Sequence, residues 1–429
     1  MLICWYVAIY CVALSLEQNI HSTAEKSVAI DENAKLVIFG MRHGNSHPRT
    51  FLNENSRTWG FEGVDELTQF GKREGFGFGK ELREFVGPLV ANNYMRHEVA
   101  FYTSSANRFY PPDTFAEWNH ALEWSPVPYT IDNPMLQMYS VPNCSTTQKA
   151  WEPIIRDDLP ELMLMIAANE QLLEYIAEHT GWNTSIESAS DLANNILEMN
   201  LYNASFPDWI ERPTLAEFDK RSLREAVMTF LDMHLLTCVS YEPCRNIMGG
   251  VWLGHILTTL RNAVDSQQSQ KFIGYVSHLE VTLSVMKLLR INQTLLDTSA
   301  GFLVEYRDKP NKSIRLLFHE TLAIDRHIIR QAEYVEELEE LSDSDRWIPF
   351  ESFYQLVKDE AITNWEEACG RQVAQCTTSG SDNVMSITDN SSGDSTLADH
   401  HITSLASCVI AIYFRNIVIM HLLSYSIMT

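Results

Sequence analysis

Two consecutive segments decide the fold of this chain: KLVIFGM at residues 35–41 and RHGNSHP at residues 42–48. The first is a short apolar run that ends at a polar, proline-containing loop, which is typical of a strand buried on both faces of a sheet. Ligands of an open parallel sheet bind beyond the carboxyl ends of its strands. Arg42 and His43 stand at that position, so the sequence predicts chemistry at the end of this strand.

The sequence that follows extends this strand into an α/β pattern. Residues 67–85 carry apolar side chains at helical spacing, although four glycines weaken the helix. Residues 99–103 read as a second strand. Strand, loop, helix and strand in this order imply a parallel α/β unit.

The rest of the domain divides into a helical part and a second group of strands. We expect helices at 159–176, 215–236, 251–264 and 280–290, and strands at 272–276, 302–306 and 314–318, the last two as a hairpin. The predicted fold is therefore α/β, with a parallel-dominated central sheet, helices on both faces and an inserted, mainly helical domain at about 150–245. The whole domain is expected at residues 33–375.

Composition excludes two classes of protein. The chain has 429 residues, of which 45% are hydrophobic and 21% charged, so a core is available and wholesale disorder is excluded. Acidic residues number 56 against 32 basic ones, which gives a net charge of -24. Such a surface repels phosphate backbones, so we expect no nucleic-acid partner. Any phosphate site must then be a local basic pocket.

Both ends of the chain carry apolar segments. Residues 2–16 are almost wholly apolar and end in small residues, so we expect a cleaved signal peptide at 1–15; because no Lys or Arg precedes them, a buried N-terminal strand stays the alternative. Residues 377–401 read as a Ser/Thr/Asp-rich stalk. The apolar tail at 402–429 fits a lipid-anchor signal or a single spanning helix, in which Arg415 would cost about 2.5–3.5 kcal/mol or more. Either one would attach the protein to a membrane.

Sequons and cysteines agree with a secretory route. The chain holds six Asn-x-Ser/Thr sequons, at Asn143, Asn183, Asn203, Asn292, Asn311 and Asn390. Outside the apolar ends it holds five cysteines, Cys144, Cys238, Cys244, Cys369 and Cys376. Their spacing is not that of a zinc site, so we expect disulfides, with at least one thiol left over. Cys238 and Cys244 are near enough to pair locally; a buried thiol on a helix end is the alternative for Cys238.

An imidazole beside a guanidinium at a strand end can attack phosphorus while the guanidinium neutralises the phosphoryl oxygens. The motifs here resemble those of the histidine acid phosphatases, in particular the insect and prostatic types. Arg42, His43, Gly44 and Pro48 match that family's Arg-His-Gly-x-Arg-x-Pro signature. Further matches follow in order: the Leu-Thr-x-x-Gly segment at 67–71, the segment Thr103–Arg108, the glycine pair at 249–250, and Tyr275 to His278.

This sequence departs from the family's pattern at two positions. Ser46 stands where the family has its second arginine; His47 and Arg49 lie nearby, but nothing in the sequence makes either a replacement. Leu279 stands where the family has the aspartate that protonates the leaving group. Glu280 follows, but on a helix one residue turns the side chain by about 100°, so Glu280 could serve only if the register shifted.

The resemblance implies a role for each matching residue. His43 would be the nucleophile and form a phosphohistidine, while Arg42, Arg108 and His278 would hold the phosphoryl oxygens. For His278, a structural role is an equal alternative. The resemblance also pairs Cys144 with Cys369, and it implies neither a cofactor nor a metal.

Two function classes stay open from the sequence. The first is a secreted or membrane-attached phosphomonoesterase, impaired by Ser46 and Leu279. The second is a non-catalytic relative that binds a phosphorylated ligand or a protein partner. Histidines 97, 120 and 234 have no motif around them and are expected to be ordinary surface or core residues.

Overall fold

The computed structural model describes residues 26–52, 59–106, 128–136 and 144–370. The expected signal peptide, the stalk and the apolar tail lie outside these ranges, as do Arg108, Asn143, Cys376 and Asn390. Within the described ranges, no helix combines the length and the hydrophobicity that crossing a bilayer requires.

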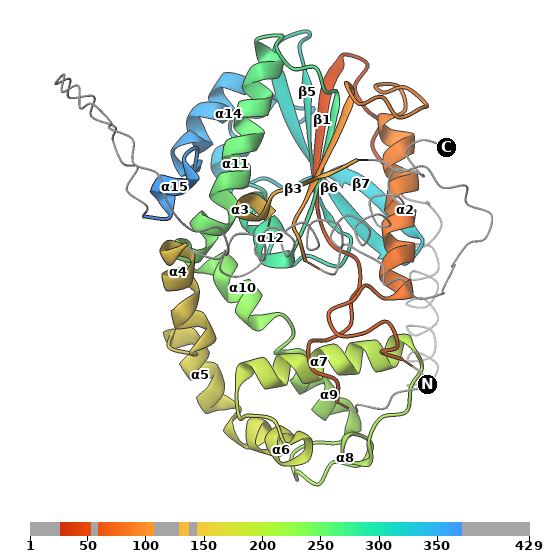
Figure 1. Cartoon of the computed structure of the whole chain (residues 1–429), viewed down its shortest axis with the longest axis vertical. Helices are drawn as coiled ribbons and strands as arrows, with labels where there is room; N and C mark the ends of the chain where they lie inside the picture. The colour runs from red at the N-terminus through yellow and green to blue at the C-terminus, as the bar shows by residue number, and fades with distance from the viewer. Residues whose placement is uncertain (1–25, 53–58, 107–127, 137–143, 371–429) are drawn as a thin grey trace, which may run out of the picture.

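An eight-stranded sheet forms the centre of the molecule, in the order β3-β2-β4-β1-β5-β6-β7, with β8 paired to β6 (Figure 1). The strands are β1 (Ala34–Arg42), β2 (Val99–Thr103), β3 (Thr130–Ile131), β4 (Phe272–Ser277), β5 (Gly301–Arg307), β6 (Ser313–Ala323), β7 (Arg326–Gln331) and β8 (Ile348–Pro349). Strands β3, β2, β4 and β1 run parallel, whereas β5, β6, β7 and β8 join antiparallel. The expected sheet, with parallel strands at its centre, is confirmed, and its antiparallel side includes the expected hairpin.

Helices cover both faces of the sheet. They are α2 (Gln69–Val86), α3 (Asn133–Leu136), α11 (Glu242–Val264), α12 (Leu279–Leu288), α13 (Glu336–Glu339), α14 (Phe350–Val357), η2 (Lys358–Glu360) and α15 (Trp365–Ala368). Helix α2 lies on one side of the sheet, and α11 and α14 lie on the other (Figure 1). The α/β class predicted from the sequence is therefore confirmed.

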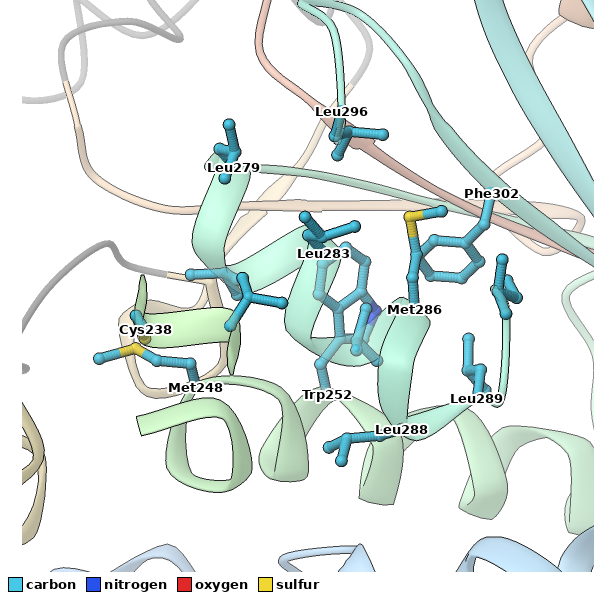
Figure 2. Close-up of a cluster of buried hydrophobic side chains, with 14 of the residues drawn as sticks. Cys238, Met248, Trp252, Leu279, Leu283, Met286, Leu288, Leu289, Leu296 and Phe302 are labelled. Atoms are coloured by element: carbon cyan, nitrogen blue, oxygen red, sulfur yellow. The ribbon is translucent and has the colours of Figure 1, made fainter. Parts of the chain in front are cut away.

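The side chains of β1 alternate between these two layers. Val37, Phe39 and Met41 belong to the apolar cluster under α2, which includes Phe78 and Leu82. Leu36 and Ile38 belong to the larger cluster on the opposite face. In that cluster, Trp252 of α11 and Met286 of α12 lie beside Phe302 of β5 (Figure 2). A strand buried on both faces needs apolar residues at consecutive positions, which explains the unbroken run at 35–41.

Between α3 and α11, seven helices of the described residues follow one another and extend away from the sheet (Figure 1). They are α4 (Ser145–Ile155), α5 (Pro160–Ala168), α6 (Glu170–Thr180), α7 (Ile186–Leu201), α8 (Asp208–Glu211), α9 (Lys220–Met228) and α10 (Met233–Ser240). We refer to α4 to α10 as the helical insertion.

Two of the helices expected in this part of the chain were wrong in extent. Each of the two expected stretches forms a pair of shorter helices. The stretch 159–176 divides at Asn169. The Asn169 side chain donates to the Met165 carbonyl (2.8 Å), which a continuous helix would pair with the Asn169 backbone amide. The stretch 215–236 becomes α9 and α10. Helix α9 begins only after Asp219, which caps it, and the chain turns at 229–232, where Asp232 has φ 56°.

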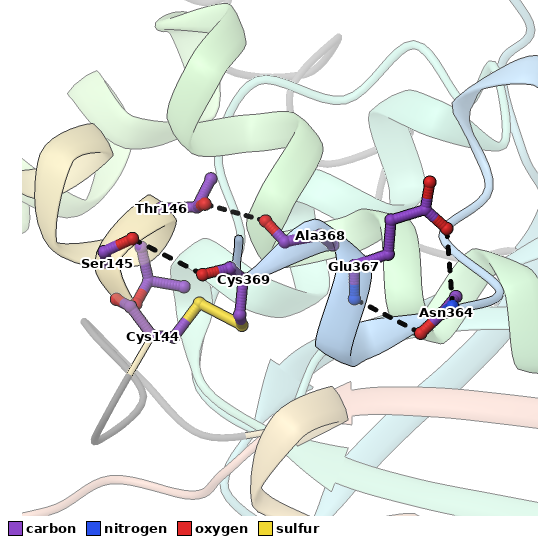
Figure 3. Close-up of a disulfide and its surroundings, with 8 residues drawn as sticks. Cys144, Ser145, Thr146, Asn364, Glu367, Ala368 and Cys369 are labelled. Carbon is purple, nitrogen blue, oxygen red and sulfur yellow. Dashed lines mark hydrogen bonds between the residues drawn. A yellow bond between two sulfur atoms is a disulfide. The ribbon is translucent and has the colours of Figure 1, made fainter. Parts of the chain in front are cut away.

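The described residues form two disulfides, and both are expected pairs. Cys144 and Cys369 have Cα atoms 4.8 Å apart, and those of Cys238 and Cys244 are 5.1 Å apart. Around the first bridge, Thr146 Oγ1 donates to the Ala368 carbonyl (2.7 Å) and Ser145 Oγ to that of Cys369 (3.4 Å) (Figure 3). The bridge thus ties α15 to the start of the helical insertion.

Removing the long-range bridge by replacing both Cys144 and Cys369 with Ala is expected to lower the free energy of unfolding by about 2–5 kcal/mol. The reason is that the unfolded chain regains freedom over a loop of 225 positions. Removing the Cys238–Cys244 bridge, which closes only 6 positions, should cost less. Chemical denaturation without reductant measures both losses, and equal losses would contradict the loop-length argument.

Candidate active site

Main-chain hydrogen bonds fix the loop after β1 to its neighbours. The His43 amide donates to the Ser277 carbonyl and the Arg42 amide to the Ala300 carbonyl, each at 2.9 Å. The Ser299 amide donates to the His43 carbonyl (3.1 Å). The sheet itself therefore sets the position of Arg42 and His43.

Two glycines let this loop pack against the start of α2. A Cβ atom on Gly44 would collide with the Gly71 carbonyl, and one on Gly71 would collide with the backbone of Asn45. Thr68 caps α2 by accepting from the Gly71 amide (3.1 Å), and its hydroxyl donates to the Asn45 side chain. The Arg-His-Gly and Leu-Thr-x-x-Gly segments therefore form one unit. Each can pack closely on the other only because the residue at the contact is a glycine and has no side chain.

Two imidazoles lie side by side at the carboxyl ends of β1 and β4. Arg42 is opposite Ser277 in the parallel register, so the next residues are His43 and His278, whose ring centroids are 5.4 Å apart. His43 Nδ1 lies 2.7 Å from the Gly44 carbonyl, which requires a proton on Nδ1 and puts the lone pair of the neutral ring on Nε2. His278 Nε2 lies 3.3 Å from Ser104 Oγ, at the end of β2.

Arg42 has protein partners on both terminal nitrogens. Nη1 donates to the Leu296 carbonyl (2.8 Å), and Nη2 donates to Asp232 Oδ2 (2.9 Å). Asp232 belongs to the helical insertion and stands immediately before α10. The insertion thus reaches the motif arginine through a carboxylate.

A cavity of about 850 Å³ opens between the sheet ends and the helical insertion. Arg42, His43, Ser46 and Leu279 are among the residues that line it. The described residues of its wall include five carboxylates and two guanidiniums, namely Glu74, Glu187, Asp191, Asp232 and Asp297 against Arg42 and Arg49. With neutral histidines this gives a balance of -3, so the part of the wall formed by described residues is acidic.

Two of these carboxyl groups have raised pKa values. Burial is the largest effect on both. It raises the pKa of Glu74, although Glu74 accepts from the Asn45 amide and the Thr298 hydroxyl. Burial raises the pKa of Asp191, on α7, to about 6. At acidic pH these groups carry protons, which lessens the negative charge of the wall.

The chain is similar in sequence to acid phosphatases and in structure to phytases. No protein-family model matches it. It is 21% identical to prostatic acid phosphatase of Rattus norvegicus over 63% of this chain and 72% of the relative, and 22% identical to lysosomal acid phosphatase of Xenopus laevis over 80% of each. A Hafnia alvei phytase in complex with myo-inositol hexakis sulphate has a TM-score of 0.56 at 11% identity, covering 79% of this chain and 98% of that one. A Klebsiella sp. ASR1 phytase has a TM-score of 0.54 at 13% identity, covering 77% and 96%. Phytases are histidine acid phosphatases.

The resemblance to the histidine acid phosphatases is confirmed. It rests on sequence similarity to the acid phosphatases and on the fold shared with the phytases. The positions at which this chain departs from the histidine acid phosphatase pattern can now be placed in the cavity.

The position after His278 holds no acid. His278 is the residue before α12, and Leu279 is its first residue, so the helix begins where the sequence suggested. Leu279 is among the cavity-lining residues, whereas Glu280 is fully buried and is not among them. The one-residue step thus turns Glu280 out of the cavity wall.

The position of the second histidine acid phosphatase arginine holds Ser46, which lines the cavity. The basic residues nearby are engaged elsewhere. Arg49 pairs with Asp65 (3.9 Å) and Glu187 (3.6 Å), and both Arg49 and Glu187 are substantially exposed. His47 is turned toward Glu62 and Glu198.

His47 lies in a buried cluster with Glu62, Glu198 and Tyr202. Its Nε2 is 2.6 Å from Glu62 Oε2 and its Nδ1 is 3.5 Å from Glu198 Oε2. Tyr202 donates to Glu62 (3.2 Å), and the Asn45 side chain donates to Glu198 (2.6 Å). Because Glu198 and Tyr202 come from α7 and the residue after it, this cluster joins the loop after β1 to the helical insertion.

Opposite pKa shifts follow within this cluster. Burial lowers the pKa of His47, but the hydrogen bonds and charges of Glu198 and Glu62 outweigh it, so the pKa lies above its ordinary value of 6.5. Burial raises the pKa of Glu62, but the hydrogen bond and charge of His47 outweigh it, so the pKa lies below its ordinary value of 4.5. Both shifts favour the ionised pair.

Sequence reasoning missed several residues of this site. Glu74 and Asp232 have no motif that marks them, and His234, expected to be ordinary, lines the cavity and lies 2.8 Å from Asp157. Of the six sequons, the four that the structure describes have exposed asparagines, at Asn183, Asn203, Asn292 and Asn311.

Replacing His47 with Gln is expected to lower the free energy of unfolding by about 3–5 kcal/mol near pH 5.5, because it leaves buried carboxylates without their cation. The raised His47 pKa stabilises the fold fully below about 6.5 and loses its effect as pH rises. The lowered Glu62 pKa stabilises the fold above 4.5 and loses its effect as pH falls. The loss should therefore be smaller at pH 8.5. Denaturation at both pH values measures it, with the exposed His97→Gln as control; a pH-independent loss would contradict the ion-pair account.

Proposed function

We propose that this protein hydrolyses phosphomonoesters through a phosphohistidine on His43. The observation that carries the proposal is the placement of Arg42 and His43 in one cavity, with the buried His278 beside His43 at the carboxyl ends of parallel strands. Similarity to acid phosphatases supports phosphomonoester hydrolysis as the kind of reaction. A nucleophile, a second donor and a guanidinium at one site are what phosphoryl transfer requires.

The reaction follows from this geometry in two steps. His43 Nε2 attacks phosphorus, an N–P bond forms, and the ester P–O bond breaks as the alkoxide or phenolate leaves and takes its proton from solvent. Water then attacks the same phosphorus, the N–P bond breaks, and inorganic phosphate leaves. Arg42 and His278, and by the resemblance Arg108, hold the phosphoryl oxygens on which charge develops.

Leu279 deprives the first step of its proton donor. An alkoxide is a poor leaving group and needs a proton, whereas a phenolate leaves with little help. General acid catalysis contributes about 10²–10⁴-fold, so its loss slows alkyl esters far more than aryl esters. The enzyme is therefore impaired and prefers phosphate esters with good leaving groups.

The charge of the cavity narrows the substrate class further. Five carboxylates against two guanidiniums repel a ligand that carries several phosphates. A singly phosphorylated ester brings less negative charge, and the cavity wall offers apolar contacts from Trp151, Ile155 and Leu235. The substrate is thus a phosphomonoester with one phosphate and an apolar or neutral remainder.

A second candidate is a relative that binds phosphorylated ligands without turnover. Ser46 and Leu279 favour it, because together they remove a cation and the acid. In that case the cavity still accepts a phosphoryl group next to Arg42 and His43.

A secretory route is part of the proposal. Two disulfides and four exposed sequon asparagines fit an oxidising compartment, as do acid phosphatase relatives. The segment 1–15 would then be a cleaved signal peptide, and the stalk at 377–401 would connect the domain at 33–375 to a membrane-attaching tail at 402–429.

The His43→Ala variant is expected to lose more than 90% of the activity on p-nitrophenyl phosphate at pH 5, because it removes the attacking nitrogen. The exposed His179 on the insertion supplies a matched control, since His179→Ala should leave activity unchanged. Initial rates of nitrophenol release measure both. Undiminished activity in the His43→Ala variant would refute the phosphohistidine, and no activity in the unmodified protein would favour the binding function.

Restoring an acid with Leu279→Asp is expected to raise turnover of glycerol phosphate, an alkyl ester, by about 10²–10⁴-fold. Turnover of p-nitrophenyl phosphate should rise much less. Leu279→Asn has nearly the same shape as the Asp variant but no acidic proton, so it separates acid catalysis from a change of packing. Equal, robust turnover of alkyl and aryl esters by the unmodified protein would mean that another group already supplies the proton.

A further inference from the structure

The guanidinium that would receive the phosphoryl group already holds an anion. Arg42 Nη2 donates to Asp232 Oδ2 at 2.9 Å, and the two side chains are only 13% and 14% exposed. The other terminal nitrogen donates to the Leu296 carbonyl. Both terminal nitrogens of Arg42, which would contact two phosphoryl oxygens, therefore have acceptors from the protein.

The backbone of Asp232 is in a conformation that few residues tolerate. Its φ of 56° and ψ of 18° lie in the left-handed region, where Asn, Asp and Gly are the usual residues. Hydrogen bonds on both sides hold it, from the Met233 amide to the Phe230 carbonyl (3.1 Å) and from the Leu236 amide to the Asp232 carbonyl (2.9 Å). This residue interrupts a stretch with helical spacing between α9 and α10.

The interruption brings the carboxylate into the cavity. Asp232 lines the same cavity as His43 and Ser46, although it comes from the helical insertion and they come from the loop after β1. Ser46 supplies no second cation in this loop. His47 and Arg49 pair with other acids, so Arg42 is the cation for which Asp232 and a phosphoryl group would compete.

We propose that Asp232 is a built-in competitor of the phosphoryl group: it occupies Arg42 in the empty site, and a ligand must displace it. The inference rests on the proposed function, because it assigns Arg42 to the phosphoryl subsite. Two anions cannot share one guanidinium without mutual repulsion. Asp232 therefore weakens binding of phosphate and its esters, and it selects ligands that make further contacts with the cavity wall.

Asp232 does not stand where it could replace the missing general acid. It accepts a hydrogen bond from Arg42 and so faces the guanidinium. Leu279 fills the position on α12 from which the family's acid acts. Asp232 therefore affects the affinity for the phosphoryl group, and it does not supply the proton that the leaving group needs.

The test is the affinity of the purified full-length protein for inorganic phosphate and orthovanadate, measured by isothermal titration calorimetry at pH 7. Asp232→Asn keeps the side-chain shape and tolerates the left-handed backbone, and Asp232→Gly provides a second variant that also does. We expect both to bind these oxyanions about 10- to 100-fold more tightly, the range of one charge-assisted hydrogen bond. Thermal unfolding verifies that the variants are folded.

The matched control is Asp297→Asn, which removes an exposed carboxylate from the same cavity wall. Its affinity should change by less than about threefold, since exposed charges are screened. An unchanged or weaker affinity in both Asp232 variants, or the same gain in Asp297→Asn, would overturn the inference. So would an absence of oxyanion binding in every variant.

This outcome is separable from that of the proposed function. Turnover tests His43, whereas oxyanion affinity tests the competition at Arg42. Activity that persists in His43→Ala would refute the phosphohistidine. The oxyanion affinities of the Asp232 variants would still decide whether Asp232 competes at Arg42. Affinity unchanged by Asp232→Asn would refute the competition even if turnover depends on His43.

Discussion

The parallel register of β1 against β4 is the constraint on which the site depends. Because Arg42 stands opposite Ser277, the first residues beyond the two strands are His43 and His278, and their rings meet at 5.4 Å. A shift by one residue would turn each side chain to the other face and separate the imidazoles. The register is held by the alternation of β1 between two apolar layers, and so by the same residues that form the core. Stability and the geometry of the site therefore have one origin.

The helical insertion acts on this preformed site through carboxylates. Glu198 contacts Asn45 and His47, and Asp232 contacts Arg42, so acids from α7 and from the turn before α10 meet three residues of one short loop. In a protein of net charge -24, a phosphate site needs local cations, yet the cations here are largely neutralised by these acids. The cavity is consequently one in which shape and apolar contact contribute to ligand choice beside charge. Glu74 and Asp191 have raised pKa values, so lowering the pH protonates them early. The cavity then repels an anion less strongly.

The sequence predicted the parts of the fold and site that depend on local pattern. The apolar run at 35–41 is β1, the helix at 67–85 is α2, and the helix expected at 280–290 is α12, from which Glu280 points away from the cavity as helical rotation predicted. The two disulfides followed from short spacing in one case and from resemblance in the other. The contacts of Glu74 and Asp232 could not be predicted, because tertiary packing brings them to the site from α2 and from the insertion. The turn at Asp232 was hidden as well, since apolar residues on both sides continue the helical spacing through it.

The bridge between Cys144 and Cys369 has a consequence for the integrity of the molecule. It encloses the helical insertion, β4, α12 and the antiparallel side of the sheet within one covalent loop. A protease that cuts once anywhere within this loop yields two fragments that stay joined through the sulfur atoms. Each fragment still carries one of the two imidazoles when the cut falls in the insertion, so a nicked molecule keeps both halves of its site together and separates only on reduction.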